Sequence, residues 1–386
     1  MPAGKFMHQH RTIRCVCVFA LLLFAALAAF GDSLDTWTRR NSGTVTNLNG
    51  VAYGHGQYVC VGQLGHILTS ADGTNWTARI SGVSTTLMGV AFGLDRFVVV
   101  GQGGVILTST NGHDWQVQTS PTTNQLNRVA LCGHQFVTGG ALGTILTSTD
   151  GEHWTKQVTP TSRTLKGFSF GNEVSVAVGQ GNSNPMLILS STNGVDWTDR
   201  SSYGVAGYAV AFGGGTFVAM DARGAPYVSS NGVSWKSVWP PAAGADYLFG
   251  ITYAQRVFVA VGGPYSASAQ RISTSHSGFT WKQKVVSTGQ SGALRDVAYG
   301  NGYFIAVGDN GLIVQSGPIF SLNWAPGNTL VLDGEAGRAY RIQSLSDLGT
   351  TNWTDILNHT NSAEVTPVLE IGSDNSGAVF YRAVIP

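Results

Sequence analysis

The feature that most constrains the fold is an internal repeat. Residues 48–76, 87–115 and 126–154 align without a gap at an interval of 39 residues, and each copy ends at a tryptophan. Each copy reads as four short strands, A to D: an apolar strand, a β-branched strand, an Ile-Leu-Thr-Ser strand, and a strand opened by the tryptophan. Regular repetition at this period indicates stacked supersecondary units rather than one irregular core. Four looser copies begin at Leu165, Tyr208, Leu248 and Leu294.

A nearly constant turn precedes each tryptophan. A serine stands six residues before it, and an Asp or Asn followed directly by Gly begins four residues before it. Asp-Gly and Asn-Gly predict a two-residue type I′ hairpin, and the Asx and Ser side chains can bond nearby backbone N–H groups. We expect the recurring turn to serve folding and each indole to be buried between neighbouring copies. In the first three copies this set is Ser70, Asp72, Gly73, Trp76, Ser109, Asn111, Trp115, Ser148, Asp150 and Trp154.

The number of strands predicts how the repeats close. The seventh copy, 294–316, lacks its tryptophan strand, whereas an unpartnered DTWTRR segment around Trp37 precedes the first copy. If the Trp37 strand pairs with the seventh copy, seven complete units result. We therefore predict an all-β fold: a seven-bladed β-propeller closed by the N-terminal strand, which removes exposed sheet edges. The alternative, an open solenoid, does not explain why the missing strand stands at the front.

The repeat resembles those of the Asp-box (bacterial neuraminidase repeat) β-propellers of secreted bacterial proteins and, distantly, those of photosystem assembly factors. The resemblance covers residues 36–316. A standard Asp box reads Ser-x-Asp-x-Gly-x-x-Trp, whereas here Gly73 follows Asp72 directly, so the box is one residue short. The motif is specific for a fold and not for an activity.

Composition agrees with a turn-rich β protein. The 386 residues include 51 Gly, and only 11% are charged, against about 7% Gly and about 25% charged residues in ordinary domains. An aromatic content of 10% excludes a disordered chain, and 12 Pro exclude a collagen-like one. Helical bundles and coiled coils need charges that are missing here.

The N-terminus predicts export. Residues 1–31 contain Lys5, Arg11 and Arg14, an apolar run over 15–30, and small residues before Asp32. This is the arrangement of a secretory signal peptide, so we expect a secreted, cell-surface or periplasmic protein with no membrane insertion after cleavage. An uncleaved membrane anchor is the alternative. The next two cysteines, Cys60 and Cys132, occupy different positions in non-adjacent repeats and are expected to be buried without a disulfide.

Residues 318–386 do not continue the repeat. Strands are expected at 340–344, 353–356 and 379–384, and the YRIQ, TNWT and FYR segments resemble the small fibronectin-III-like β-sandwich that ends many secreted bacterial proteins. The predicted domains are therefore a signal peptide (1–31), a propeller (32–317) and this tail (318–386). A plain structural cap is an equally good interpretation of the tail.

Catalysis of the sialidase type is not supported. That resemblance implies three arginines, a Tyr–Glu pair and an Asp acid on the face bearing the D–A and B–C loops. The two glutamates of the propeller, Glu152 and Glu173, fall in C–D and A–B turns, on the opposite face, and the Phe/Tyr-Arg-Ile-Pro motif is missing. A carboxylate pair remains conceivable. Its members would come from Asp199, Asp221, Asp246, Asp296 and Asp309.

The sequence offers no cofactor or metal motif. The histidines are scattered, without His-x-x-x-His or Cys-x-x-Cys spacing, and the Gly-rich segments are hairpin loops with no helix to follow them. With 22 basic and 21 acidic residues the chain lacks the basic excess of a nucleic-acid binder. We expect no cofactor, no metal, no nucleic acid and a monomeric state.

Function is expected where the repeats differ from one another. The longer copies add residues in B–C loops of blades four and six, beside aromatic D–A loops. Aromatic rings with a few polar groups suit a carbohydrate or a peptide, although Trp239 and Tyr247 could instead pack their own loop. The candidate ligand-binding residues are Arg200, Tyr203, Asp221, Arg223, Trp239, Tyr247, Tyr265 and Arg271.

Three functions therefore remain open. The first is a secreted, non-catalytic propeller that binds a carbohydrate or a protein through loops of blades four to six. The second is a glycoside hydrolase or lyase with aspartates in place of the missing glutamates, for which Asp221 is the first residue to test. The third is an assembly or scaffolding factor of the cell envelope.

Overall fold

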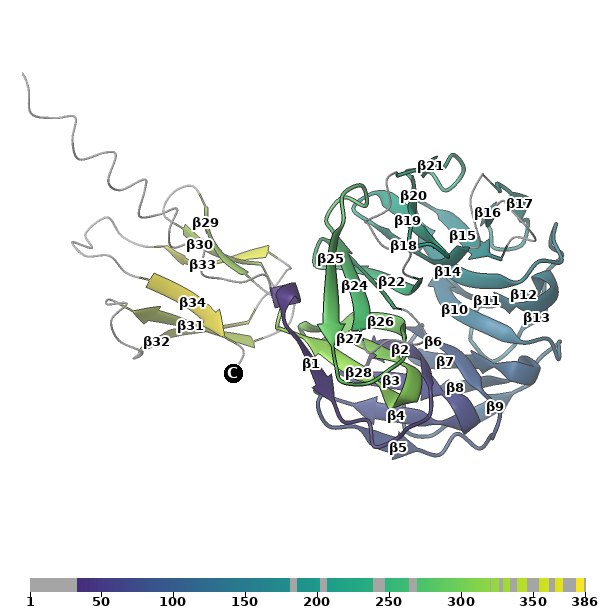
Figure 1. Ribbon diagram of the computed structural model, residues 1–386, viewed down its shortest axis with the longest axis horizontal. Helices are drawn as coiled ribbons and strands as arrows, with labels where there is room; N and C mark the ends of the chain where they lie inside the picture. Colours follow the sequence, from purple (N-terminus) through teal and green to yellow (C-terminus); the bar gives the residue numbers. More distant parts are fainter. Residues whose placement is uncertain are drawn as a thin grey trace, which may run out of the picture.

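The computed structural model describes residues 33–180, 186–201, 207–238, 247–263 and 269–319. Beyond them it describes six strands, at 321–325, 329–333, 339–345, 354–360, 365–370 and 380–384. Figure 1 shows blades arranged around a common axis, with the remaining strands beside them. The predicted signal peptide, 1–31, lies outside the described residues. In the described part of the chain no helix is long and apolar enough to cross a membrane.

Seven four-stranded antiparallel sheets form the propeller, so the predicted all-β seven-bladed fold is confirmed. Blade 1 contains β2 (Leu48–Gly54), β3 (Gln57–Gly62), β4 (Ile67–Ser70) and β5 (Thr77–Arg79); blade 2, β6 (Leu87–Gly93), β7 (Arg96–Gly101), β8 (Ile106–Ser109) and β9 (Gln116–Gln118); blade 3, β10 (Leu126–Cys132), β11 (Gln135–Gly140), β12 (Ile145–Ser148) and β13 (Thr155–Lys156). Blade 4 contains β14 (Leu165–Gly171), β15 (Val174–Gly179), β16 (Leu187–Ser191) and β17 (Thr198–Asp199); blade 5, β18 (Gly207–Gly213), β19 (Thr216–Asp221), β20 (Pro226–Ser229) and β21 (Lys236–Ser237); blade 6, β22 (Leu248–Ala254), β23 (Val257–Gly262), β24 (Ala269–Ser275) and β25 (Lys282–Ser287).

Blade 7 is closed by the N-terminal strand. It contains β26 (Leu294–Gly300), β27 (Tyr303–Gly308) and β28 (Ile313–Ser316), and its outer strand is β1 (Trp37–Arg40). Trp37 pairs with Ser316 and Arg40 with Ile313. The predicted closure is therefore confirmed, and the open-solenoid alternative is wrong.

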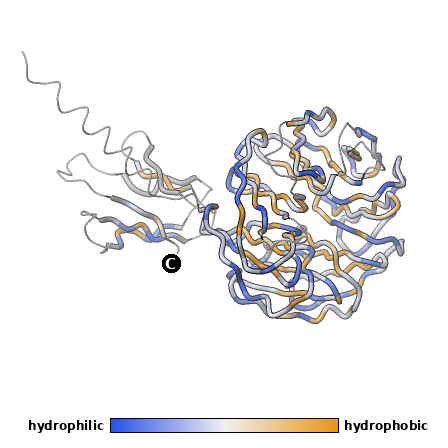
Figure 2. The backbone as a smooth tube through the Cα atoms, viewed as in Figure 1, coloured by the Kyte–Doolittle hydropathy of each residue, from blue (hydrophilic) through white to orange (hydrophobic). Residues whose placement is uncertain are grey.

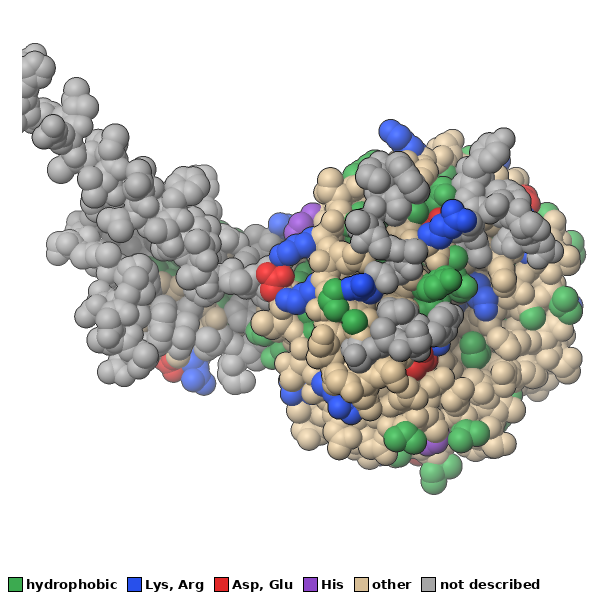
Figure 3. Space-filling view, viewed as in Figure 1, with side chains coloured by type: hydrophobic (Ala, Val, Ile, Leu, Met, Phe, Trp, Pro, Cys, Tyr) green, Lys and Arg blue, Asp and Glu red, His purple; other side chains and the backbone are tan. Residues whose placement is uncertain are grey.

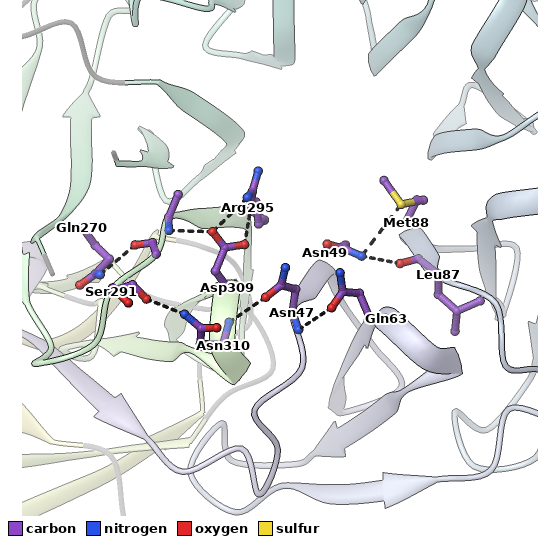
Figure 4. A network of polar contacts seen from close by, with 12 residues as sticks. Asn47, Asn49, Gln63, Leu87, Met88, Gln270, Ser291, Arg295, Asp309 and Asn310 are labelled. Carbon is purple, nitrogen blue, oxygen red and sulfur yellow. Dashed lines mark hydrogen bonds and ion pairs between the residues drawn. The ribbon is translucent and has the colours of Figure 1, made fainter. Parts of the chain in front are cut away.

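Polar contacts join blades 7 and 1 at the seam (Figure 4). The Asn310 backbone N–H donates to Asn47 Oδ1 over 2.9 Å. The Asn47 carbonyl in turn accepts the Gln63 N–H at 2.9 Å. These bonds attach the B–C loops of blades 7 and 1 to residues 41–47, which carry the chain from β1 of blade 7 into β2 of blade 1.

The core lies between adjacent blades. Each hydrophobic cluster combines residues of two neighbours, as where Tyr58 and Leu68 of blade 1 meet Ile305 and Ile313 of blade 7. Figure 2 shows apolar segments running along the strands of every blade. One indole belongs to each of the seven interfaces, which confirms the predicted burial between copies. These are Trp37, Trp76, Trp115, Trp154, Trp197, Trp235 and Trp281.

The innermost strands approach so closely that side chains are excluded. Each A strand contacts the A strand of the next blade, and β26 returns to β2. A Cβ on Gly250 would lie 2.7 Å from Asp296 Cα. At the far end of an A strand, a Cβ on Gly213, the last residue of β18, would lie 1.9 Å from the ring of Tyr253 in the next blade. Part of the glycine excess thus comes from inter-blade contact rather than from turns alone.

The turn before each tryptophan differs from the prediction. In blade 1, Ser70 Oγ accepts the Gly73 N–H at 2.8 Å, and Asp72 Oδ1 accepts the N–H groups of Thr74 and Asn75. The Trp76 indole N–H donates to the Gly73 carbonyl. Side-chain bonding to backbone is thereby confirmed. The two-residue type I′ hairpin is wrong, because Thr69 pairs with Thr77 and only Gly73 has a positive φ.

Type I′ geometry is instead found in the A–B turns. Leu94 and Asp95 have φ of 46° and 56°, and Asn172 and Glu173 have 47° and 61°. Two successive residues with positive φ match the twist of the strands they join. The A–B hairpins are therefore the tight ones, and the C–D connections are longer loops ordered by their own side chains.

Cys60 and Cys132 are both free and buried. Burial raises the pKa of the Cys60 thiol, with a smaller contribution from Asp296, and raises that of Cys132 to about 12. The expectation of small buried hydrophobes without a disulfide is confirmed.

The strands that follow the propeller form two three-stranded antiparallel sheets. One contains β29 (Ser321–Ala325), β30 (Thr329–Asp333) and β33 (Val365–Glu370); the other contains β32 (Thr354–Thr360), β31 (Ala339–Leu345) and β34 (Phe380–Val384). Leu330, Leu332, Tyr340 and Ile342 are buried. The fibronectin-III-like character of this tail stays a prediction.

Candidate binding face

The D–A and B–C loops share one end of the propeller, here called the loop face. The first N–H of a B–C loop donates to the last carbonyl of the preceding D–A loop, as from Gln102 to Thr86 at 2.9 Å and from Asp309 to Ala293 at 3.0 Å. These bonds fix the loops at the entrance of the A strands.

The second residue of every A strand stands near this entrance, one from each blade. We call this set the axial ring. It is polar or flexible in blades 1 to 3 and cationic or aromatic in blades 4 to 7. Its members are Asn49, Met88, Asn127, Lys166, Tyr208, Phe249 and Arg295.

One residue deeper, an ion pair crosses the axis. Glycine or alanine occupies this level in five blades, but blade 3 has Arg128 and blade 7 has Asp296. Arg128 Nη1 lies 3.1 Å from Asp296 Oδ2 and donates to the Asn49 carbonyl of blade 1. Asp296 Oδ2 also accepts the Val51 N–H. The pair thus links blades 1, 3 and 7.

Arg295 is held by its own carboxylate and by an aromatic ring. Its Nε and Nη2 donate to the two oxygens of Asp309 at 2.8 and 3.0 Å, and its guanidinium lies 4.8 Å from the centre of the Phe249 ring. Phe249 stacks with Tyr247 and meets Tyr208 edge-on. Blades 5 to 7 therefore meet in a cluster of three aromatic rings and the guanidinium of Arg295, which Asp309 neutralises.

Lys166 differs from Arg295, the other cation of the ring. Among the described residues no carboxylate or hydrogen-bond acceptor contacts its ammonium group. Burial lowers the pKa of Lys166, and the positive charges of Arg128 and Arg295 lower it further. Lys166 is therefore a partly buried cation that its surroundings disfavour.

Five of the eight predicted ligand-binding residues lie in the described part of the chain. Tyr203, Trp239 and Tyr265 lie outside the described residues. Tyr247 belongs to the aromatic cluster and is 39% exposed, so it both packs and remains accessible. Arg200 Nε donates to Ser190 Oγ of its own blade, and Arg271 lies within β24, paired with Gly262 and Val285.

Asp221 orders a turn. It is 3% exposed, and its Oδ1 accepts the N–H groups of Arg223 and Ala225 at 2.8 and 2.9 Å. Burial raises its pKa, an effect that these bonds and Arg223 oppose. In blade 1, Gly62 occupies the same register position. Asp221 thus replaces a glycine and stabilises its own loop.

The other candidate carboxylates are also engaged. Asp296 and Asp309 pair with arginines as described, and Asp199 lies 3.3 Å from Arg163. On the opposite face Glu152 pairs with Arg96. Asp246 lies outside the described residues. Within the described ranges no group of His, Cys, Asp and Glu could hold a metal ion.

Exposed aliphatic side chains stand on the loop face of blades 1 and 3. Leu64 and Leu142, each in a B–C loop, are 66% and 67% exposed and have left-handed φ of 55° and 54°. Blade 2 places Gly103 and blade 7 places Asn310 at this position, as the left-handed region favours. Figure 3 shows hydrophobic side chains as separate patches on the propeller surface in this view.

The axial ring and these leucines were not among the sequence-predicted site residues. The inserted residues of the B–C loops pointed to blades 4 to 6. The axial ring, in contrast, differs between copies by substitution alone, with no inserted residue. Aligning the A strands of the seven copies reveals it, because this column changes from Asn49 and Met88 in early copies to Arg295 in the last.

No protein-family model matches the chain, and no curated protein matches it. Its fold is similar to that of solved propellers. A structure of YCF48 bound to D1 peptide has a TM-score of 0.60 at 16% identity, covering 75% of this chain and 97% of that one. Virginiamycin B lyase from Staphylococcus aureus, in a catalytically inactive form with quinupristin, has a TM-score of 0.62 at 11% identity, covering 74% and 99%.

A third similar structure is the WD40 β-propeller domain of Doa1, with a TM-score of 0.55 at 14% identity, covering 73% of this chain and 97% of that one. One of these neighbours is bound to a peptide and another is a lyase. At such identities they establish a shared β-propeller fold for this chain.

Proposed function

We propose that this chain is a non-catalytic binding propeller that recognises a protein or peptide through its loop face. The observation that carries the proposal is the conformation of Leu64 and Leu142. A leucine in the left-handed region costs about 1–2 kcal/mol relative to glycine. Because both side chains are exposed, no burial of apolar surface offsets this cost in the free protein. An apolar partner surface that covers both side chains accounts for their presence.

The carboxylates of the propeller support binding rather than hydrolysis. A glycosidase needs two carboxyl groups aimed at one bond. Here Asp199, Asp296 and Asp309 pair with arginines, and Asp221 accepts backbone N–H groups within its own turn. The same leucines favour a protein over a carbohydrate, because a sugar offers little apolar area to cover them.

We further propose that the protein acts outside the cytoplasm, because residues 1–31 have the composition of a signal peptide. Mass spectrometry of the exported chain tests this: the expected N-terminus follows Ala28 or Gly31. An intact N-terminus on protein retained in the cytoplasm would contradict it.

The binding proposal is tested by selecting random peptides on the full chain and measuring their affinity for the Leu64→Gly/Leu142→Gly double variant. Glycine is the residue that blade 2 uses at this position, so the fold is retained. Losing two covered leucines is expected to weaken binding by about 2–4 kcal/mol, or roughly 30-fold to 1000-fold.

Leu94→Gly is the matched control. Leu94 also has a left-handed φ, 46°, and is 40% exposed, but it lies in an A–B turn at the opposite end of the blade. Its replacement is expected to leave peptide affinity unchanged. Selected peptides that bind the double variant as tightly as the parent, or that yield only carbohydrate-competed binding, contradict the proposal.

A further inference from the structure

The charges near the propeller axis do not balance. Arg128 is neutralised by Asp296, and Arg295 by Asp309. Lys166 remains, and in the described part of the propeller no carboxylate pairs with it. The axial ring, the level below it and the Asp309 carboxylate together therefore carry one positive charge in excess.

The neighbours of Lys166 do not compensate for that charge. On one side β10 supplies Asn127, whose amide donates to the Leu165 carbonyl, and Arg128. On the other side β18 supplies Tyr208, which meets Phe249 edge-on. Across the axis β26 supplies Arg295 and Asp296. Two of these groups repel an ammonium, and the one carboxylate among them is bonded to Arg128 and to Val51 N–H.

The fold does not require a lysine at position 166. Blades 1, 2 and 3 place uncharged Asn49, Met88 and Asn127 at the same ring position, so an uncharged side chain fits. Lys166 sits instead where burial and two like charges lower its pKa. An anion bound beside the Lys166 ammonium would compensate this charge and so remove the free-energy cost of burying it.

We propose that Lys166 binds a single carboxylate of the peptide ligand, at the axial ring. The inference rests on the proposed function and adds the chemistry of the ligand. One excess positive charge matches a monoanion. The carboxylate is either an Asp or Glu side chain or the C-terminus of the peptide.

The experiment compares selected peptides with their neutralised forms on the full chain. Each peptide is made with Asp or Glu changed to Asn or Gln, and separately with an amidated C-terminus. One of the two changes is expected to weaken binding to the parent protein at least tenfold, as for other charge-assisted hydrogen bonds. Which change does so identifies the source of the carboxylate.

The Lys166→Met variant completes the cycle. It copies Met88 of blade 2, and it is expected to bind the charged peptide at least tenfold more weakly while no longer distinguishing charged from neutral peptide. Without ligand it is expected to melt at or above the parent temperature, because a disfavoured cation has been removed. Lys156→Met, on the exposed outer strand β13, is the charge-matched control and should alter neither property.

Two results overturn the inference. Peptides that need Leu64 and Leu142 but bind equally well after neutralisation show that the proposed function holds and the carboxylate site does not exist. An Asp246→Asn variant that lowers the melting temperature in the parent but not in Lys166→Met shows that Asp246 is the internal counter-ion. If no peptide binds, the proposed function fails, and this inference with it.

Discussion

Arg128 and Asp296 form an ion pair across the propeller axis, with 3.1 Å between Nη1 and Oδ2 and side chains only 19% and 16% exposed. They stand 168 positions apart in the chain, in blades 3 and 7. Removing one partner of a mostly buried pair leaves the other uncompensated. The pair therefore ties the two halves of the ring together.

Asp296→Asn is expected to destabilise the protein by about 3 kcal/mol because Arg128 then lacks its counter-charge. The Arg128→Gly/Asp296→Gly double variant, which restores the small residue of the other blades, is expected to lose less stability than Arg128→Gly and Asp296→Gly lose together. Urea unfolding of the parent and these three glycine variants measures this coupling. Additive losses would mean that the two residues do not act as a pair.

Closure of the propeller depends on Trp37 within β1. Trp37 packs against the cluster between blades 6 and 7, and its indole N–H donates to the Leu34 carbonyl at 2.9 Å. Trp37→Ala is expected to cost about 3 kcal/mol, measured by thermal unfolding. Thr38→Ala, an exposed neighbour on the same strand, should stay within about 0.5 kcal/mol of the parent. Equal effects would contradict a closing role for the indole.

The Ser-x-Asx-Gly turns predict a dependence on acid. Partial burial of Asp72 is outweighed by bonds from Asn75, Thr74 and Ser70, which lower its pKa from 3.8 to about 2. Because the folded-state pKa is depressed, the stabilisation is present above pH 3.8 and is lost as the pH falls towards about 2. Asn111 performs the same bonding in blade 2 without a titrating group.

Asp72→Asn is therefore expected to keep most of the stability at pH 7 and to flatten the profile between pH 4 and 2. Asp72→Ala, which removes the acceptor, is expected to cost about 1 kcal/mol at pH 7. Melting temperatures across this range decide the matter. An Asn variant whose profile follows that of the parent would show that Asp72 does not contribute to it.

Close contact between blades predicts intolerance at Gly213. Its added Cβ would lie 1.9 Å from the Tyr253 ring, so Gly213→Ala should destabilise by about 1–3 kcal/mol in urea unfolding. A Tyr253→Leu replacement in the same protein makes room and should recover part of the loss. No recovery would place the strain elsewhere.

The repeat made the blades, their number and the closing strand predictable, because strand pattern and turn chemistry recur at fixed spacing. The turn type was not, since Asp-Gly fits both a tight hairpin and the longer loop that Asp72 orders. Asp221 resembles a binding residue in sequence, and only its 3% exposure and its bonds to Arg223 and Ala225 reveal a structural role.

The sequence reveals the members of the axial ring but not the contacts between them. The pairing of Arg128 with Asp296 depends on how far seven A strands stand from a common axis, which no spacing in the chain encodes. Lys166 has no counter-charge among the described residues because Asp296, the carboxylate one level below the ring, already pairs with Arg128.

The methyl group of Met88 reports directly on recognition through the loop face. Met88 lies in the axial ring on the loop face, whereas Met220 is buried between blades 5 and 6. Adding a selected peptide to protein labelled at methionine methyls should shift the Met88 resonance in proportion to occupancy and leave Met220 in place. Saturable binding that leaves Met88 unshifted would contradict recognition through the loop face.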